Sequence, residues 1–265
     1  LKRIHEALEA AGRALQPFVP GAVKADYKSA GDPVTEADRA VNHVLHETLL
    51  RDGEGWLSEE SADDQVRLGK DRVWIVDPLD GTREFVSGIP EWCVSIAFVE
   101  SGRATAAGIK NPATGETFLG SLGSGVVFNG KAVHASPRHS LPGALVLASR
   151  SEVKRGEWKR FDGSSFSIQP MGSVAYKLAR VAAGLADATW TLTPKHEWDV
   201  AAGVLLVEAA GGFVSTLTDG QPSFNNESAL MPGLIAGGRG LRDDISSFLR
   251  PHLQARTMSA SPDRS

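Results

Sequence analysis

Two aspartates lie three residues apart, Asp77 and Asp80, in the segment 77–82 (DPLDGT). The segment follows the apolar run 72–76, which is typical of a buried strand that ends in a polar turn. Mg²⁺ takes oxygen ligands, commonly one or two carboxylates together with water and substrate phosphate. The segment therefore predicts a site for a hard divalent cation. A solvated surface turn is the simpler explanation for the pair alone, and other carboxylates must decide between the two.

Further carboxylates are present in both halves of the chain. Glu59 and Glu60 follow an apolar pair, and Asp199 follows Trp198 at the start of a predicted helix, where the helix dipole favours a negative charge. Each has a plain alternative, since Asp199 would serve as a helix cap and the glutamates as a solvated pair.

Four motifs resemble, in order and approximate spacing, the signatures of the inositol monophosphatase superfamily. They are GDPVTEAD at 31–38, LSEE at 57–60, WIVDPLDGT at 74–82 and EWDVAAG at 197–203. The resemblance extends from the first helix to about Phe248. It implies an α+β fold, a layered αβαβα sandwich of the inositol monophosphatase and fructose-1,6-bisphosphatase type. It also implies Mg²⁺-dependent hydrolysis of a small phosphomonoester, with sensitivity to Li⁺.

The resemblance also implies roles for individual residues. Glu59, Asp77 and the carbonyl of Leu79 would hold one cation, and Asp77, Asp80 and Asp199 a second, with two or three Mg²⁺ ions per site. Thr82 would orient the attacking water while Asp38 or Glu59 accepts a proton. The predicted contacts to substrate are Asp80, Gly81, Thr82, Ser149, Lys177 and Asp199.

Several side features resemble the 3′(2′),5′-bisphosphate nucleotidase branch of the superfamily. They are LSEE at 57–60, TREF at 82–85, ASRS at 148–151 and the segment 224–233. Lys177 falls where those enzymes carry a lysine suited to a second phosphate, and a solvent-facing helical lysine is the alternative. The segment TPKHE at 193–197 places further basic groups beside the predicted site. We therefore expect hydrolysis of adenosine 3′,5′-bisphosphate. The alternatives are an inositol-1-phosphate or other small sugar or alcohol phosphate phosphatase, and a catalytically silent binding protein.

The elements that position these residues follow from hydrophobic spacing. We predict helices at 1–15, 35–51, 152–161, 174–183 and 200–210. Predicted strands are 72–76, 93–100, 104–110, 117–121 and 126–128, which form an antiparallel meander, and then 144–148, 188–192 and 213–217. We expect an N-terminal lobe at 1–136, a C-terminal lobe at 137–253 and a mobile tail at 254–265.

Composition excludes several classes of function. The net charge of −4 offers no positive field for a nucleic-acid polymer. The chain has no run of eighteen apolar residues and no leader-like start, so we expect no membrane segment and a cytoplasmic protein. The single cysteine, Cys93, excludes a multi-cysteine metal cage, and we interpret it as a packing residue rather than a nucleophile. A homodimer is expected from the resemblance alone.

Overall fold

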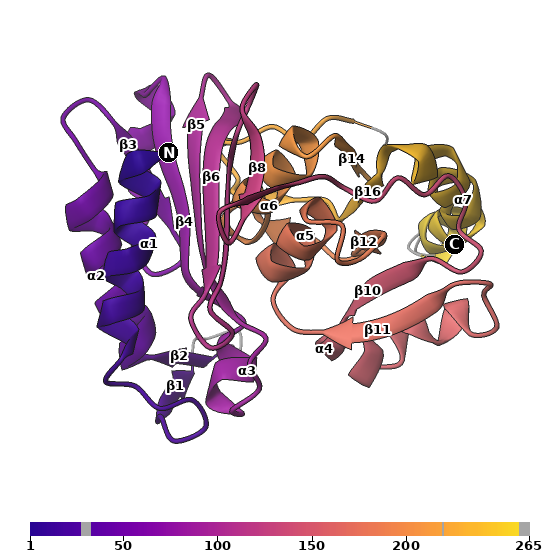
Figure 1. Ribbon diagram of the computed structural model, residues 1–265, viewed down its shortest axis with the longest axis horizontal. Helices are drawn as coiled ribbons and strands as arrows, with labels where there is room; N and C mark the ends of the chain where they lie inside the picture. The colour runs from indigo at the N-terminus through magenta and orange to yellow at the C-terminus, as the bar shows by residue number, and fades with distance from the viewer. Residues whose placement is uncertain (28–32, 219, 260–265) are drawn as a thin grey trace, which may run out of the picture.

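The computed structural model describes residues 1–27, 33–218 and 220–259, with side chains up to 253, and arranges them in five layers (Figure 1). Helices α1 (Lys2–Leu15) and α2 (Glu36–Leu49) cover the outer face of a seven-stranded sheet. Helices α5 (Val174–Ala182) and α6 (Glu197–Ala209) lie between this sheet and a five-stranded one. Helices α4 (Arg150–Lys154) and α7 (Arg242–Ser259) lie beyond the second sheet. The predicted αβαβα sandwich is confirmed.

The seven-stranded sheet is a meander in chain order with one parallel pair at its edge. Its strands are β3 (Gly55–Ser58), β4 (Arg72–Asp80), β5 (Cys93–Glu100), β6 (Arg103–Asn111), β7 (Glu116–Ser121), β8 (Gly125–Phe128) and β9 (Lys131–Val133). Only β3 and β4 run parallel. The predicted antiparallel meander is confirmed, and the Gly-rich stretch after β7 is a hairpin turn.

The five-stranded sheet mixes directions. Its order is β11 (Ser167–Met171), β10 (Leu145–Ser149), β12 (Ala188–Trp190), β16 (Leu234–Gly238) and β14 (Gly212–Thr216). Strand β10 is parallel to both neighbours, and β16 is antiparallel to both of its own. The chain changes sheets between β9 and β10, close to the lobe boundary expected at residue 136. The division into two lobes stays a prediction, because α6 contacts strands of both sheets.

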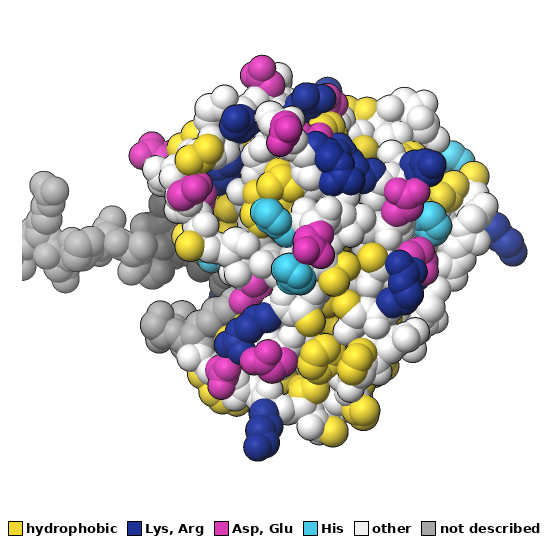
Figure 2. Space-filling model, turned by 90° about the vertical axis from the view of Figure 1, so that its left-hand side faces the viewer, with side chains coloured by type: hydrophobic (Ala, Val, Ile, Leu, Met, Phe, Trp, Pro, Cys, Tyr) yellow, Lys and Arg dark blue, Asp and Glu magenta, His cyan; other side chains and the backbone are white. Residues whose placement is uncertain are grey.

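The residues of α1 and α2 explain their place in the outer layer. The apolar face of α1 carries Ile4, Leu8 and Leu15, all buried against the sheet. Thr35 and Asp38 form a capping box at the start of α2, where the predicted helix 35–51 begins. Figure 2 shows the outward face of this layer, where basic and acidic side chains are intermixed and hydrophobic side chains lie between them. Neither charge sign dominates this face.

Helix α6 is apolar on every side, as its position between two sheets requires. Val200 through Val207 are all buried in a cluster shared by the two sheets. Glu197, at the first turn, is also buried, and its carboxylate accepts hydrogen bonds from the backbone N–H groups of Asn225 and Asn226. The start of α6 is therefore held in place by a network that the sequence did not reveal.

Three predictions about elements need correction. The predicted helix 152–161 is two short pieces, α4 and a 3₁₀ helix at Glu157–Phe161, because Gly156 takes a left-handed φ of 78°. The stretch between the first two predicted helices, where no strand was expected, contains two short strands, β1 (Ala25–Tyr27) and β2 (Pro33–Thr35). Helix α7 continues to Ser259, inside the expected tail, and residues 260–265 lie outside the described residues.

Several elements were not predicted from the sequence. They are strands β3, β9, β11, β13 (Lys195–His196), β15 (Leu230–Met231) and β16, the short helix α3 (Thr82–Val86) and helix α7. Among the described helices, none combines the length and apolar character needed to cross a membrane.

Candidate active site

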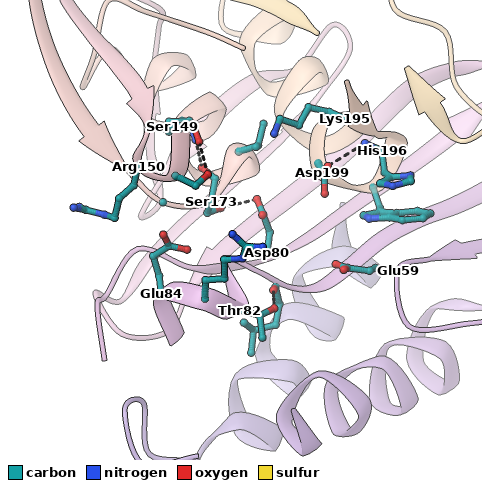
Figure 3. A pocket seen from close by; sticks show the side chains of 18 of the residues that line it. Glu59, Asp80, Thr82, Glu84, Ser149, Arg150, Ser173, Lys195, His196 and Asp199 are labelled. Atoms are coloured by element: carbon teal, nitrogen blue, oxygen red, sulfur yellow. Dashed lines mark hydrogen bonds between the residues drawn. The ribbon is translucent and has the colours of Figure 1, made fainter. Parts of the chain in front are cut away.

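A cavity of about 370 Å³ opens where the ends of β4 and β10 meet the starts of α3, α5 and α6 (Figure 3). Glu59 and Thr82 enter it from the first half of the chain, and Ser149, Lys177 and Asp199 from the second half. The cavity thus brings together most residues that the sequence singled out. Its other lining residues are Pro33, Leu79, Asp80, Gly81, Arg83, Glu84, Arg150, Ser151, Gly172, Ser173, Val174, Pro194, Lys195, His196, Trp198 and Leu230.

The predicted turn at 77–82 is the irregular end of β4. Asp77 pairs with Ser95 and Asp80 pairs with Cys93, and the register shifts between the two pairs. Strand β4 therefore bulges where both aspartates lie. Gly81 follows with a left-handed φ of 98°, and a Cβ at this position would lie 2.8 Å from the carbonyl oxygen of Glu91. Only glycine permits this close turn into α3.

Three carboxylates converge at the floor of the cavity. Asp77, Asp80 and Asp199 each offer an oxygen within 4.8 Å of the others. One oxygen of Asp77 accepts a hydrogen bond from the backbone N–H of Leu79, whereas the other, Oδ2, is buried and has no hydrogen-bond partner in the described part of the chain. A buried carboxylate oxygen without a partner is unusual, and it indicates a missing ligand.

The electrostatics of this cluster also favour a cation. Burial, together with the charges of Glu59, Asp80 and Asp199, raises the pKa of Asp77 well above its ordinary value. Burial and the charge of Asp80 raise the pKa of Asp199 to about 8. Carboxyl groups that repel one another in a buried site are stabilised in their charged form by a divalent cation. The residues therefore fit Mg²⁺.

The start of α5 fixes Asp80 from the opposite side. Oδ2 of Asp80 accepts hydrogen bonds from the Ser173 hydroxyl and from the backbone N–H of Ala175, both at 2.6 Å. Figure 3 shows the Ser173 bond reaching across the cavity. Neither partner was predicted from the sequence, although Ser173 precedes a predicted helix and is a typical N-cap residue. Its hydroxyl also accepts a hydrogen bond from the N–H of Tyr176, so it caps α5 as well.

Thr82 and Asp38 form a hydrogen-bonded pair beside the carboxylate cluster. The Thr82 hydroxyl lies 3.1 Å from Oδ1 of Asp38 and 3.0 Å from the carbonyl oxygen of Leu79. The other oxygen of Asp38 accepts hydrogen bonds from the N–H and hydroxyl of Thr35, both at 2.7 Å. Burial raises the pKa of Asp38 above its ordinary value, against the effect of these donors. Glu59, the alternative proton acceptor, lines the cavity but lies outside the three-carboxylate cluster.

Lys177 is buried, so the solvent-facing alternative is wrong. Only 3% of the residue is exposed, and Nζ donates to the carbonyl oxygens of Ser173 at 2.9 Å and Met171 at 3.5 Å. Burial lowers its pKa to about 8, while the charge of Asp80 opposes the shift.

The remaining predicted residues have clear places. Ser149 is the N-cap of α4, and its hydroxyl lies 3.0 Å from that of Ser151. Cys93 is buried, and burial raises the pKa of its thiol well above the ordinary value, as expected for a packing residue. Trp198 stacks on His196 at the rim, with ring centroids 4.4 Å apart.

An ion pair that the sequence did not reveal joins the two halves beside the cavity. Arg150 binds both carboxylate oxygens of Glu91, and Glu91 also accepts the backbone N–H of Gly172 at 2.7 Å. Because Gly172 directly precedes Ser173, this clamp positions the segment that holds Asp80. We call Glu91, Arg150 and Gly172 the Glu91 clamp.

Comparisons with known proteins agree with this geometry. The inositol monophosphatase family matches this chain over residues 2–248. An inositol-1-monophosphatase of Mesorhizobium japonicum is 34% identical over 238 residues, which cover 86% of this chain and 87% of the relative. The Nus factor SuhB of Pseudomonas aeruginosa is 34% identical over 250 residues, covering 88% and 89%.

The solved structure of an IMPase of Thermotoga maritima superposes with a TM-score of 0.82 at 28% identity, covering 96% of this chain and 99% of that one. The family match spans both sheets and every carboxylate of the cluster. This chain therefore belongs to the inositol monophosphatase family, whose members are Mg²⁺-dependent phosphatases.

Proposed function

We propose that the cavity hydrolyses a small phosphomonoester by direct attack of water. Glu59, Asp77, Asp80, Asp199 and the carbonyl of Leu79 would hold two or three Mg²⁺ ions. When bound, Mg²⁺ supplies positive charge that neutralises the phosphoryl oxygens and lowers the pKa of water. The observation that carries the proposal is the Thr82–Asp38 pair beside the three carboxylates, because it adds a proton relay to a cation site.

The hydrogen bonds of this pair suggest a path for the proton that the attacking water loses. A hydroxyl has one proton to donate, so Thr82 accepts a hydrogen bond from water when its own proton is directed to Asp38. Asp38 is held in place by Thr35 and receives the proton through Thr82. Burial raises the pKa of Asp38, which makes it a better base than a solvated aspartate.

Phosphate binding is assigned to the residues that follow Asp80. Gly81 and Thr82 line the cavity at the start of α3, and their backbone N–H groups are the donors that we propose for the phosphate. Ser149 lines the cavity from the second half and would contact the organic part of the substrate.

Adenosine 3′,5′-bisphosphate remains our first candidate substrate, on the motifs at 57–60, 82–85, 148–151 and 224–233. Inositol 1-phosphate is the second candidate, and the names of relatives favour it. A silent binding protein is the least favoured, since the carboxylate cluster and the Thr82–Asp38 pair are intact. Four expectations stay predictions. The partner is a small phosphorylated molecule and not a nucleic-acid polymer, the protein forms a homodimer, it is cytoplasmic, and Li⁺ inhibits it.

Phosphate release from a panel of esters tests the proposal. The panel contains adenosine 3′,5′-bisphosphate, inositol 1-phosphate and fructose 1,6-bisphosphate at equal concentration with Mg²⁺. We expect Asp77→Asn to abolish release from every ester, because the variant loses a charge at the centre of the cluster. The control is Glu227→Gln, which removes one exposed acidic group. Substantial residual turnover of Asp77→Asn at saturating Mg²⁺ would contradict the cation assignment.

A further inference from the structure

Four basic side chains line the cavity, and they differ in what already binds them. Arg150 is bound by both oxygens of Glu91, and Lys177 donates to two backbone carbonyls. Arg83 is exposed at the outer edge and has interactions of its own. Lys195 is different, because its ammonium makes no hydrogen bond or ion pair with any residue that the structure describes.

The backbone holds Lys195 in position to face the cavity. It lies in β13, four residues before Asp199, and pairs with Met231 of β15. Figure 3 shows its side chain extending into the cavity from the α6 side, away from Thr82. Burial raises the pKa values of Asp80 and Asp199, and the charge of Lys195 opposes both shifts, so Lys195 lies near both. In the described part of the chain its Nζ nevertheless forms no ion pair within 4 Å with either carboxylate.

We propose that Lys195 binds a second anionic group of the substrate, separate from the phosphate that is hydrolysed. This inference rests on the proposed phosphatase function and narrows its substrate class to bisphosphates. Bound Mg²⁺ would neutralise Asp80 and Asp199. Glu152, the other carboxylate near Lys195, accepts its hydrogen bonds from Trp158, Thr191 and Thr193. The Lys195 ammonium therefore keeps its N–H donors and part of its positive charge for a ligand. A sugar or inositol hydroxyl does not neutralise that charge, whereas a second phosphate does.

The inference changes which lysine we expect to select the substrate. The Lys177 ammonium is committed to the carbonyls of Met171 and Ser173, so it supports the segment that holds Asp80. The Lys195 side chain is only partly buried, and its ammonium has no hydrogen-bond partner in the described part of the chain, so it can donate to a ligand. Ser149 and Ser151 line the same cavity and offer hydroxyl donors to the same group.

Matched substrate pairs test the inference. Adenosine 3′,5′-bisphosphate and adenosine 3′-monophosphate share the scissile ester and differ only in the second phosphate, as do inositol 1,4-bisphosphate and inositol 1-phosphate. We expect the parent to prefer the bisphosphate of at least one pair by roughly tenfold or more in kcat/KM. We expect Lys195→Gln to reduce that preference roughly tenfold or more and Lys195→Glu to reverse it.

Two further variants serve as comparisons. Lys131→Gln removes the same charge from an exposed position in β9, and we expect it to keep the parent's preference. Lys177→Met should lower kcat/KM for both members of a pair without changing their ratio, because it loosens the segment that holds Asp80.

Each other outcome is decisive. Equal losses for both members of a pair in Lys195→Gln would overturn the inference and assign Lys195 to the cation site. A parent with no preference for either bisphosphate overturns it while the phosphatase function stands. A ratio that changes in Lys177→Met and not in Lys195→Gln also overturns it. Absence of release from every ester refutes the phosphatase function and the inference together.

Discussion

Replacing Asp199 by asparagine should make the metal-free protein less sensitive to alkaline pH. In the unfolded chain this carboxyl ionises near its ordinary pKa of 3.8, whereas in the fold burial and Asp80 raise the pKa to about 8. A folded pKa above the unfolded one means that the folded state binds the extra proton. Stability is therefore complete below the unfolded pKa and is lost as the pH rises through the folded pKa.

The magnitude follows from the width of this window. Each pH unit between the two pKa values removes about 1.4 kcal/mol from the free energy of unfolding, so a rise from about pH 5 to about pH 8 removes about 4 kcal/mol at most. Asp199 is partly exposed at the cavity, and solvent screening reduces the effect to about 1–3 kcal/mol. Over the same rise in pH, the free energy of unfolding of Asp199→Asn should therefore fall by about 1–3 kcal/mol less than that of the parent.

The assay is urea unfolding in EDTA at both pH values, compared between the parent, Asp199→Asn and the exposed control Glu227→Gln. The control removes an acidic group that is exposed and does not belong to the three-carboxylate cluster, so it should follow the parent. Mg²⁺ added at the higher pH should stabilise the parent more than Asp199→Asn. Equal pH dependence of the parent and Asp199→Asn would refute the electrostatic account of the cluster.

Two further predictions concern residues around the cluster. Thr82→Val keeps the shape of the side chain but removes the hydroxyl that contacts Asp38, so kcat should fall roughly a hundredfold or more while circular dichroism and melting temperature stay close to the parent's. An unchanged kcat would exclude the proposed relay. Glu91→Gln weakens the Glu91 clamp, and we expect a loss of about 1–2 kcal/mol in urea unfolding together with a higher Mg²⁺ concentration for half-maximal activity. A normal Mg²⁺ dependence would show that the clamp does not position Asp80.

The sequence predicted the parts of the fold that local patterns determine. Ile4, Leu8 and Leu15 recur at helical spacing, and Thr35 with Asp38 marks the start of α2, so both outer helices were found. The helix predicted at 152–161 failed, because the left-handed backbone at Gly156 divides it. Strand β11 was missed, since Gln169 and Pro170 interrupt its apolar pattern and its pairing with β10 decides its conformation.

In the candidate site, too, the sequence predicted the residues that lie in local motifs and missed the contacts between distant residues. The carboxylates lie in short motifs, and the structure brings Asp77, Asp80 and Asp199 together. The bonds of Ser173 to Asp80 and of Glu91 to Arg150 join residues far apart in the chain, and no local spacing encodes them. The burial of Lys177 depends on how α5 packs between the two sheets, so its helical position alone left both alternatives open.

The placement of Asp199 at the start of α6, between the two sheets, also sets the order in which the site is completed during synthesis. Asp77 and Asp80 leave the ribosome long before Asp199, and the Ser173 hydroxyl that fixes Asp80 emerges between them. A nascent chain that contains only the seven-stranded sheet thus holds an incomplete cation site. With the proposed ligands, Mg²⁺ would gain its full set of protein ligands only after α6 has packed between the sheets. The metal would then stabilise the finished fold and give little help to the first half.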